Sequence, residues 1–298
     1  SSISADSLNE ELTKSNYDPQ LIDKSLSVSI RAIDWIAILS NDQIDCLLIV
    51  HNYIEQIIQI QANELKLYYE LEWRKLTLPK SDVNNKQTLF ITQLINDFIG
   101  IDKIEKKLRS FESKAKTIDI NYKATSLQPV IRVIEERILI AMPYKALQLL
   151  TNLHQSSEWQ LEIQSDSNDE ISTLDQSAYI KEISTNFIQL LETITNIHSL
   201  PTSVGNKWMS KTVEAVDNSY INEIAHIPRF SKRGIDQLKT DIEYYLNFLG
   251  CIIQKGGDVL QTILRILQAE PGNRLEIINT ADVLSFELKD SFRKSLMT

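Results

Sequence analysis

Two consecutive helices are predicted most strongly within residues 208–267, WMSKTVEAVDNSYINEIAHIPRFSKRGIDQLKTDIEYYLNFLGCIIQKGGDVLQTILRIL. After Pro228, Ser231 is the expected N-cap, because its hydroxyl can accept a hydrogen bond from a backbone N–H of the first turn. Apolar residues then recur at steps of three and four, which places them on one face of a helix. They are Ile235, Leu238, Ile242, Tyr245, Leu246, Leu249, Ile252 and Ile253.

The same helix has a second apolar strip along its side, formed by Tyr244, Phe248 and Cys251. Two apolar faces predict an inner helix that neighbouring elements cover along two edges. The pair Gly256-Gly257 ends the run, and Asp258 is the expected cap of a further helix. That helix would end before Pro271, and its core face would be Leu260, Ile263, Leu264 and Leu267.

This stretch resembles the C-terminal end of the seventh-subunit family of the conserved oligomeric Golgi complex. The resemblance covers roughly residues 205–275, and upstream of them only the helical character matches. The chain departs from the family at Tyr245, where an aliphatic residue is usual, and at Gly250, where a polar or charged residue is usual. The positions that carry the resemblance are Trp208, Ala215, Tyr220, Ile227, Pro228, Ser231, Gln237, Leu238, Thr240, Asp241, Ile242, Tyr244, Asn247, Leu260, Gln261, Ile263 and Leu267.

The resemblance implies a fold of stacked helical bundles within a complex that captures vesicles recycling inside the Golgi. It implies a non-catalytic helical scaffold for intra-Golgi retrograde transport, located at the cytoplasmic face of the Golgi membrane and attached to that membrane peripherally. The implied partners are the other subunits of the tethering complex, and beyond them SNARE membrane-fusion proteins, small GTPases and coiled-coil tethers. The N-terminal part through which the family's seventh subunit pairs with the fifth is not recognisable in this sequence.

Composition independently predicts long helices, because the 298 residues include only 7 Gly and 7 Pro. Residues 42–76 contain neither and would form one helix of about 50 Å with two apolar seams. Two seams on one helix imply neighbours on two sides. The expected fold is therefore all-α, with elongated stacked antiparallel helical bundles that form a helical rod.

An acidic stretch at residues 156–175 breaks the helical pattern and is the expected boundary between two parts of the chain. We expect an N-terminal helical bundle at 18–155, an acidic linker at 156–175 and a C-terminal helical bundle at 176–298. The expected helices beyond the opening stretch are 86–116, 129–154 with a kink at Pro143, 176–199, 206–227, and a last helix after Thr280 that carries Val283, Leu284, Phe286 and Leu288.

Charge suggests where partners bind. The formal net charge of -9 argues against nucleic acid as the main partner, since binding to phosphates requires a dominant basic surface. A local basic strip at the end of the 86–116 helix contains Lys103, Lys106 and Lys107. This strip is either a contact for anionic lipid headgroups or an acidic partner, or a solvated helix end whose cations are offset by neighbouring carboxylates.

Trp159 is a further candidate contact residue, because Trp159, Leu161 and Ile163 alternate as in an extended strand. Such a segment would dock on a neighbouring surface. The alternative interpretation is a loop that packs its own aromatic residue.

Motifs for catalysis and for metal or cofactor binding are not found. The four histidines His51, His154, His198 and His226 are isolated in sequence, and there is no zinc, phosphate-loop or nucleophile-elbow motif. Cys46 and Cys251 are expected to be small buried apolar groups. We therefore expect no enzyme activity, no cofactor and no metal.

Three alternatives remain from sequence alone. One is a subunit of another multisubunit tether, of the exocyst-like kind. Another is a peripheral lipid-binding helical module, which would bind anionic membranes in a salt-dependent way. The third is an enzyme whose site is assembled from residues distant in sequence.

Overall fold

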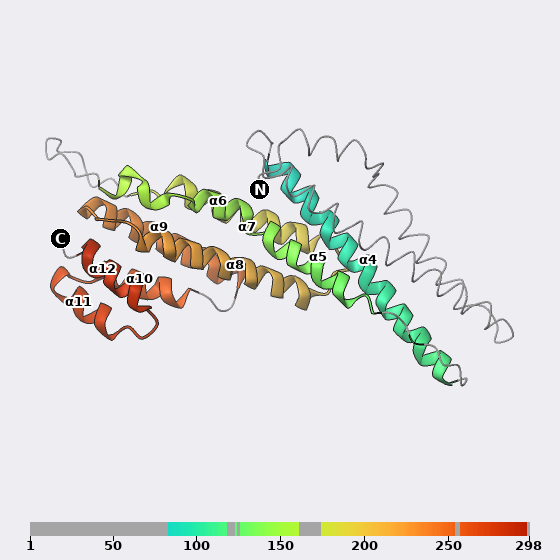
Figure 1. Ribbon diagram of the computed structural model, residues 1–298. Helices are drawn as coiled ribbons and strands as arrows, with labels where there is room; N and C mark the ends of the chain where they lie inside the picture. The colour runs from blue at the N-terminus through green and yellow to red at the C-terminus, as the bar shows by residue number, and fades with distance from the viewer. Residues whose placement is uncertain (1–82, 118–122, 124–125, 161–173, 254–256, 297–298) are drawn as a thin grey trace, which may run out of the picture. The chain divides into compact units, whose positions relative to one another are not determined.

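The computed structural model describes residues 83–117, 123, 126–160, 174–253 and 257–296. Every regular element within these ranges is a helix (Figure 1), which confirms the predicted all-α class. The helix expected over residues 42–76, and Cys46 and His51 within it, lie outside the described residues.

The chain divides into two compact units. One comprises Ser1–Pro79 with Gln93–Arg137, and the other comprises Lys80–Thr92 with Ile138–Thr298. Short helices on both sides of residue 156 pack against helices of the second unit. The expected division into 18–155, a linker at 156–175 and 176–298 remains a prediction.

The first unit contains the larger parts of two helices, α4 (Val83–Thr117) and α5 (Gln128–Ala141). The position of α4 agrees with the expected helix over 86–116. Its buried side chains in this unit follow the helical period, as predicted for a core-facing stripe. They are Leu94, Ile95, Phe98, Ile99, Ile101, Ile104 and Leu108.

Pro143 breaks the helix expected over 129–154, and the prediction of a mere kink was wrong. Helix α5 ends at Ala141, and a separate helix α6 begins at Tyr144 and ends at Leu150. Proline lacks the backbone N–H that would continue the ladder, and its ring clashes with the preceding turn. Two short 3-10 helices follow, η2 (Leu153–Gln155) and η3 (Ser157–Trp159).

The second unit is built on three helices, α7 (Ala178–Thr195), α8 (Thr202–Ala225) and α9 (Lys232–Ile252). Short connections join them in sequence, which is typical of antiparallel neighbours. Helix α6 packs against α7 and α8, and α10 (Asp258–Gln268) packs against α8 and α9. The unit is completed by α11 (Pro271–Thr280) and α12 (Phe286–Leu296), and α12 returns to α8.

A chain of five aromatic rings forms the centre of this bundle. Tyr179 and Tyr220 lie 6.1 Å apart between ring centroids, and Tyr220 and Tyr245 lie 5.9 Å apart. Tyr245 then stacks on Phe187 at 6.4 Å, and Phe187 on Phe248 at 6.3 Å. Because the rings come alternately from α7, α8 and α9, their contacts fix the three helices against one another.

Helix α9 begins as predicted, since the Ser231 hydroxyl accepts a hydrogen bond from the Gly234 N–H at 3.0 Å. Its main apolar face is buried at Leu238, Ile242, Tyr245 and Leu249. The second strip differs from the prediction, because its last member, Cys251, is an exposed free thiol. Phe248 in the same strip stacks on Phe187 of α7, whereas Tyr244, Phe248 and Cys251 also line an open groove.

The connection between α8 and α9 is held by two distant parts of the chain. The backbone N–H of Phe230 donates to the carbonyl of Ser295 at 3.3 Å, and that of Ser231 donates to the carbonyl of Trp159 at 2.8 Å. Residues 230 and 231 therefore join η3, which precedes α7, to α12 near the end of the second unit.

The C-terminal part departs from the sequence-based prediction in two respects. Gly257, with a left-handed φ of 83°, occupies the N-cap position of α10, and Asp258 is the first residue of the helix and not its cap. Helix α11 was not predicted, because it starts directly at Pro271, a residue that was interpreted as a stop although proline also suits the first helical position.

The last helix is also shorter than expected. It begins at Phe286, so Val283 precedes it, and these two side chains are 75% and 50% exposed. Of the four apolar residues expected on this helix, Val283 and Leu284 precede it, and Phe286 and Leu288 lie within it. Leu284 and Leu288 are buried.

Candidate functional site

The basic strip predicted as a contact surface lies on α4, in the first unit. Lys103 and Lys106 are exposed, and Lys107 is partly buried. Lys106 pairs with Asp102 one turn earlier, with Nζ 2.6 Å from the carboxylate oxygen. An exposed pair of this kind contributes little stability, but it offsets the charge of the lysine.

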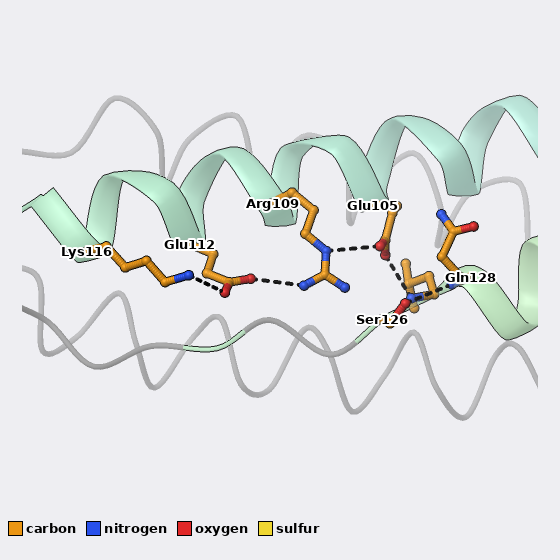
Figure 2. Close-up of polar contacts among 7 residues, drawn as sticks. Glu105, Arg109, Glu112, Lys116, Ser126 and Gln128 are labelled. Carbon is orange, nitrogen blue, oxygen red and sulfur yellow. Dashed lines mark hydrogen bonds and ion pairs between the residues drawn. The ribbon is translucent and has the colours of Figure 1, made fainter.

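The strip continues as a ladder of alternating charges (Figure 2). Arg109 donates from Nε to Glu105 at 3.1 Å and from Nη1 to Glu112 at 3.0 Å, and Lys116 donates to Glu112 at 2.9 Å. The hydrogen bonds to Glu105 and Glu112, the first above all, raise the pKa of the Arg109 guanidinium. Glu105 is buried and also accepts the backbone N–H of Leu127 at 2.7 Å, just before α5.

This ladder connects α4 to the start of α5 and pairs Lys106, Arg109 and Lys116 with carboxylates. The geometry favours a solvated helix end whose charges stabilise the hairpin of α4 and α5 over a surface of uncompensated positive charge. The contact surface at Lys103, Lys106 and Lys107 remains a prediction.

Trp159 is a core residue, and its prediction as an accessible contact is corrected. The indole is fully buried, its Nε1–H donates to the Leu153 carbonyl at 2.7 Å, and its ring meets Phe230 edge-on at 6.4 Å. It lies in the 3-10 helix η3 and not in an extended strand, since the chain turns here to pack its own aromatic ring against α9. Leu161 and Ile163 lie outside the described residues.

The family-motif positions on α9 divide into two sets. In the inward-facing set, Leu238 and Asp241 are fully buried. Asp241 Oδ1 accepts the backbone N–H of Ser177 at 2.8 Å and the Gln237 amide at 3.1 Å, and its Oδ2 accepts the Tyr179 hydroxyl at 2.9 Å. These bonds attach α9 to the first turn of α7.

The network extends into α8 because the Tyr179 and Tyr220 hydroxyls lie 2.9 Å apart. Burial, with smaller contributions from Tyr220 and Asp241, raises the pKa of Tyr179 well above its usual range. Tyr179 is therefore neutral at physiological pH and can donate to the carboxylate. Gln237 and Asp241 thus act as structural residues that orient three helices.

The outward-facing set consists of Thr240, Tyr244 and Asn247, and it lines one side of an open groove of about 420 Å³. Cys251 continues the same line, since steps of four, three and four residues follow one face of a helix. Phe248 forms an apolar part of the groove and is held from behind by its stacking on Phe187. This surface is missed when the whole strip is interpreted as core.

Two of the histidines that were considered isolated meet in the second unit. The rings of His154 and His226 lie 5.9 Å apart, and Glu223 accepts from both the backbone and Nδ1 of His154, at 3.1 and 2.7 Å. No sequence spacing signals this cluster, because η2 reaches α8 across many residues.

No group of three or more His, Cys, Asp or Glu side chains within the described ranges is arranged to hold a metal ion. A search of the helices in those ranges likewise found none with the length and apolar character needed to cross a bilayer.

Residues 194–288 match the family described as Golgi complex component 7 (COG7). The matched range contains α8 to α11, both sets of motif positions on α9, and the open groove beside Tyr244. It confirms the family resemblance expected from the sequence of this region. A search of the curated proteins found no match.

Proposed function

We propose that this chain, whose residues 194–288 match the Golgi complex component 7 family, works as a non-catalytic helical scaffold in a Golgi vesicle-tethering complex. The observation that carries the proposal is that the family match falls on one coherent structural unit. Within it, motif residues of α9 bond to the start of α7 and line an open groove on the other side.

The mechanism of such a scaffold is geometric. The aromatic core and the Asp241 network hold α7, α8 and α9 in one arrangement, so surface side chains keep fixed positions. A preorganised surface loses less conformational entropy on binding than a flexible one. Contacts with the other subunits would therefore be made by exposed and groove-lining residues, while the buried motif residues support them.

The finer parts of the proposal follow from the family. The complex would act in intra-Golgi retrograde transport, at the cytoplasmic face of the Golgi membrane, and this chain would reach the membrane through its partner subunits. SNAREs, small GTPases and coiled-coil tethers are the partners expected of the assembled complex.

The test is affinity purification of the tagged native protein from its own cells, followed by quantitative mass spectrometry. Recovery of the other Golgi-complex subunits in amounts comparable to the tagged chain is the expected result. If the subunits of a different tether are recovered, the scaffold role stands, but the chain belongs to that other complex. Recovery of no large helical partner at low salt would contradict the proposal.

A matched pair of variants makes the test specific for the folded unit. Asp241→Asn breaks the network between α9 and α7, whereas Asp236→Asn removes a partly exposed carboxylate of the same helix that pairs with Lys239. We expect recovery of the other subunits to fall with the first variant and to stay unchanged with the second.

A further inference from the structure

A second groove, of about 430 Å³, opens beside α8 within the family-matched range. Aliphatic side chains of α8, of the end of α9 and of α10 line it, among them Val213, Ile253 and Val259. Three carboxylates line it as well, those of Glu214, Asp217 and Asp258. We call this surface the α8 groove.

Asp217 is the unusual member of the α8 groove. It is only 8% exposed, and its Oδ1 accepts the Tyr245 hydroxyl at 2.8 Å. Its Oδ2 makes no hydrogen bond with any described residue, and no described cation pairs with it. Burial raises the pKa of Asp217 to about 6, although the hydrogen bond from Tyr245 acts in the opposite direction.

The other two carboxylates differ in how they are compensated. Glu214 pairs with Lys211 at 2.7 Å, one turn away on α8. Asp258 is exposed in the first turn of α10, where the helix dipole favours a negative charge, and none of the described cations pairs with it. Asp217 and Asp258 therefore leave the groove with negative charge that the described residues do not neutralise.

We infer that the α8 groove receives a lysine or arginine side chain from another subunit of the tethering complex. This inference rests on the proposed function. The aliphatic stem of such a side chain fits against Val213, Ile253 and Val259, and its cationic end meets Asp217 and Asp258. The second carboxylate oxygen of Asp217 then gains a charge-assisted hydrogen bond, which is about twice as strong as a bond between neutral groups.

A purely structural role does not explain an aspartate at position 217. A buried carboxylate without a cation disfavours the folded state, whereas asparagine has the same shape and can still accept the Tyr245 hydroxyl without a charge. Residues that disfavour folding where a neutral residue would serve are typical of binding sites.

The experiment compares two double variants of the full chain that change the net charge equally. Asp217→Asn with Asp258→Asn removes the uncompensated charge of the α8 groove. Glu276→Gln with Asp282→Asn removes two exposed carboxylates in and after α11, outside the groove, and serves as the control. The probe is the purified assembly of the remaining subunits of the Golgi complex, and binding is titrated at low and at physiological salt.

We expect the groove variant to bind the assembly about tenfold or more weakly and with a smaller dependence on salt, because a desolvated charge pair is lost. The control variant should bind within about twofold of the parent. Carbodiimide coupling of carboxylates to amines, followed by peptide mass spectrometry, should join Asp217 or Asp258 to a lysine of another subunit when the occupant is lysine.

Three results would overturn the inference. If the parent and the groove variant bind equally well, the groove is not a contact, although the proposed function stands. If coupling joins Asp217 to Lys255 of the same chain, the occupant is internal. If the parent binds none of the subunits, the proposed function fails and this inference fails with it. If the double variant does not fold, the single variant Asp258→Asn replaces it in the binding titration. Asp258 is exposed, so its replacement should not affect folding, and weaker binding by this variant still tests the groove.

Discussion

Two buried aspartates in the second unit have the same side chain but different surroundings. Asp241 accepts from a backbone N–H, an amide and a hydroxyl, so both of its oxygens are satisfied. Asp217 accepts only from Tyr245. The same change to asparagine should therefore have opposite effects on stability at the two positions.

For Asp217→Asn we expect a more stable protein at pH 7.5. The pKa of about 6 in the folded state lies above that of an unfolded aspartate, so the folded state binds the proton more tightly. The stability contributed by protonated Asp217 is full below about pH 4 and is lost as the pH rises through 6. Asparagine does not ionise, so the variant does not lose this stability, and its free energy of unfolding at pH 7.5 should exceed that of the parent by about 1–3 kcal/mol.

Urea unfolding of parent and variant at pH 7.5 and at pH 4 measures this gain. The difference in unfolding free energy should nearly vanish at pH 4, where Asp217 is protonated in the folded parent. An equal difference at both pH values would show that desolvation of the charge is not its cause.

For Asp241→Asn we expect a loss of about 2–3 kcal/mol, because an amide NH₂ would replace one acceptor and face a donor group. Chemical denaturation at pH 7.5 measures the loss. Asp236→Asn on the same helix is the matched control and should change stability by less than about 0.5 kcal/mol, since its pair with Lys239 is partly exposed. Comparable losses in both variants would argue against the network as the cause.

At the scale of elements, the packing of η3 on the start of α9 depends on one glycine. A Cβ on Gly234 would collide with the backbone carbonyl of Trp159. The same carbonyl accepts the hydrogen bond from Ser231, so it cannot move away without losing that bond. Gly234 therefore permits the close approach of two segments that are distant in sequence.

The substitution Gly234→Ala should destabilise the protein by about 1–3 kcal/mol, because overpacking against backbone forces the segments apart. A Cβ on Gly250, near the other end of α9, would extend into open space, so Gly250→Ala should stabilise the helix by about 0.5–1 kcal/mol. Thermal melting followed by circular dichroism distinguishes the two. A melting temperature unchanged by Gly234→Ala would mean that η3 does not pack tightly in solution.

The elements that sequence predicted well are those decided by local periodicity. The period of apolar residues located the buried face of α9, and a side-chain hydroxyl located its start at Ser231. The predictions that failed depend on how neighbouring elements pack. Periodicity cannot show how far along an apolar strip a neighbouring helix reaches: Phe248 stacks on Phe187 of α7, whereas Cys251 at the end of the same strip is exposed. At Pro143 and Pro271, the ambiguity is between a proline that interrupts a helix and one that begins the next.

The candidate site was less predictable than the fold, for a physical reason. Its groups come together only through tertiary packing: Asp217 meets Tyr245 across 28 positions, and Trp159 meets Phe230 across a longer separation. A strand-like alternation around Trp159 has the same pattern whether the ring faces a partner or the core. The pairing of cations and carboxylates along α4 was predictable by contrast, because Asp102, Glu105 and Glu112 lie one helical turn from their partners in sequence.

At the scale of the whole molecule, the candidate contact surfaces lie in different units, the basic strip in the first and the α8 groove in the second. Charge reversal at Lys103, Lys106 and Lys107 to glutamate should leave recovery of the other subunits unchanged, because the charge of the strip is largely offset within α4. The measurement is the same quantitative affinity purification. The α8 groove variant, which is expected to lose binding, serves as the positive control. Selective loss of one subunit with the lysine variant would instead identify the strip as a contact.

The connection between α8 and α9 has a practical consequence for cloning. Its two backbone bonds reach Trp159 and Ser295, and both of these residues lie outside the family-matched segment 194–288. Expression limited to that segment would leave the N–H groups of Phe230 and Ser231 without their acceptors and would remove Tyr179 and Phe187 from the aromatic core. A soluble product is therefore expected only from a longer piece such as residues 80–298, which contains the whole second unit, because the boundaries of the sequence signature fall inside that unit.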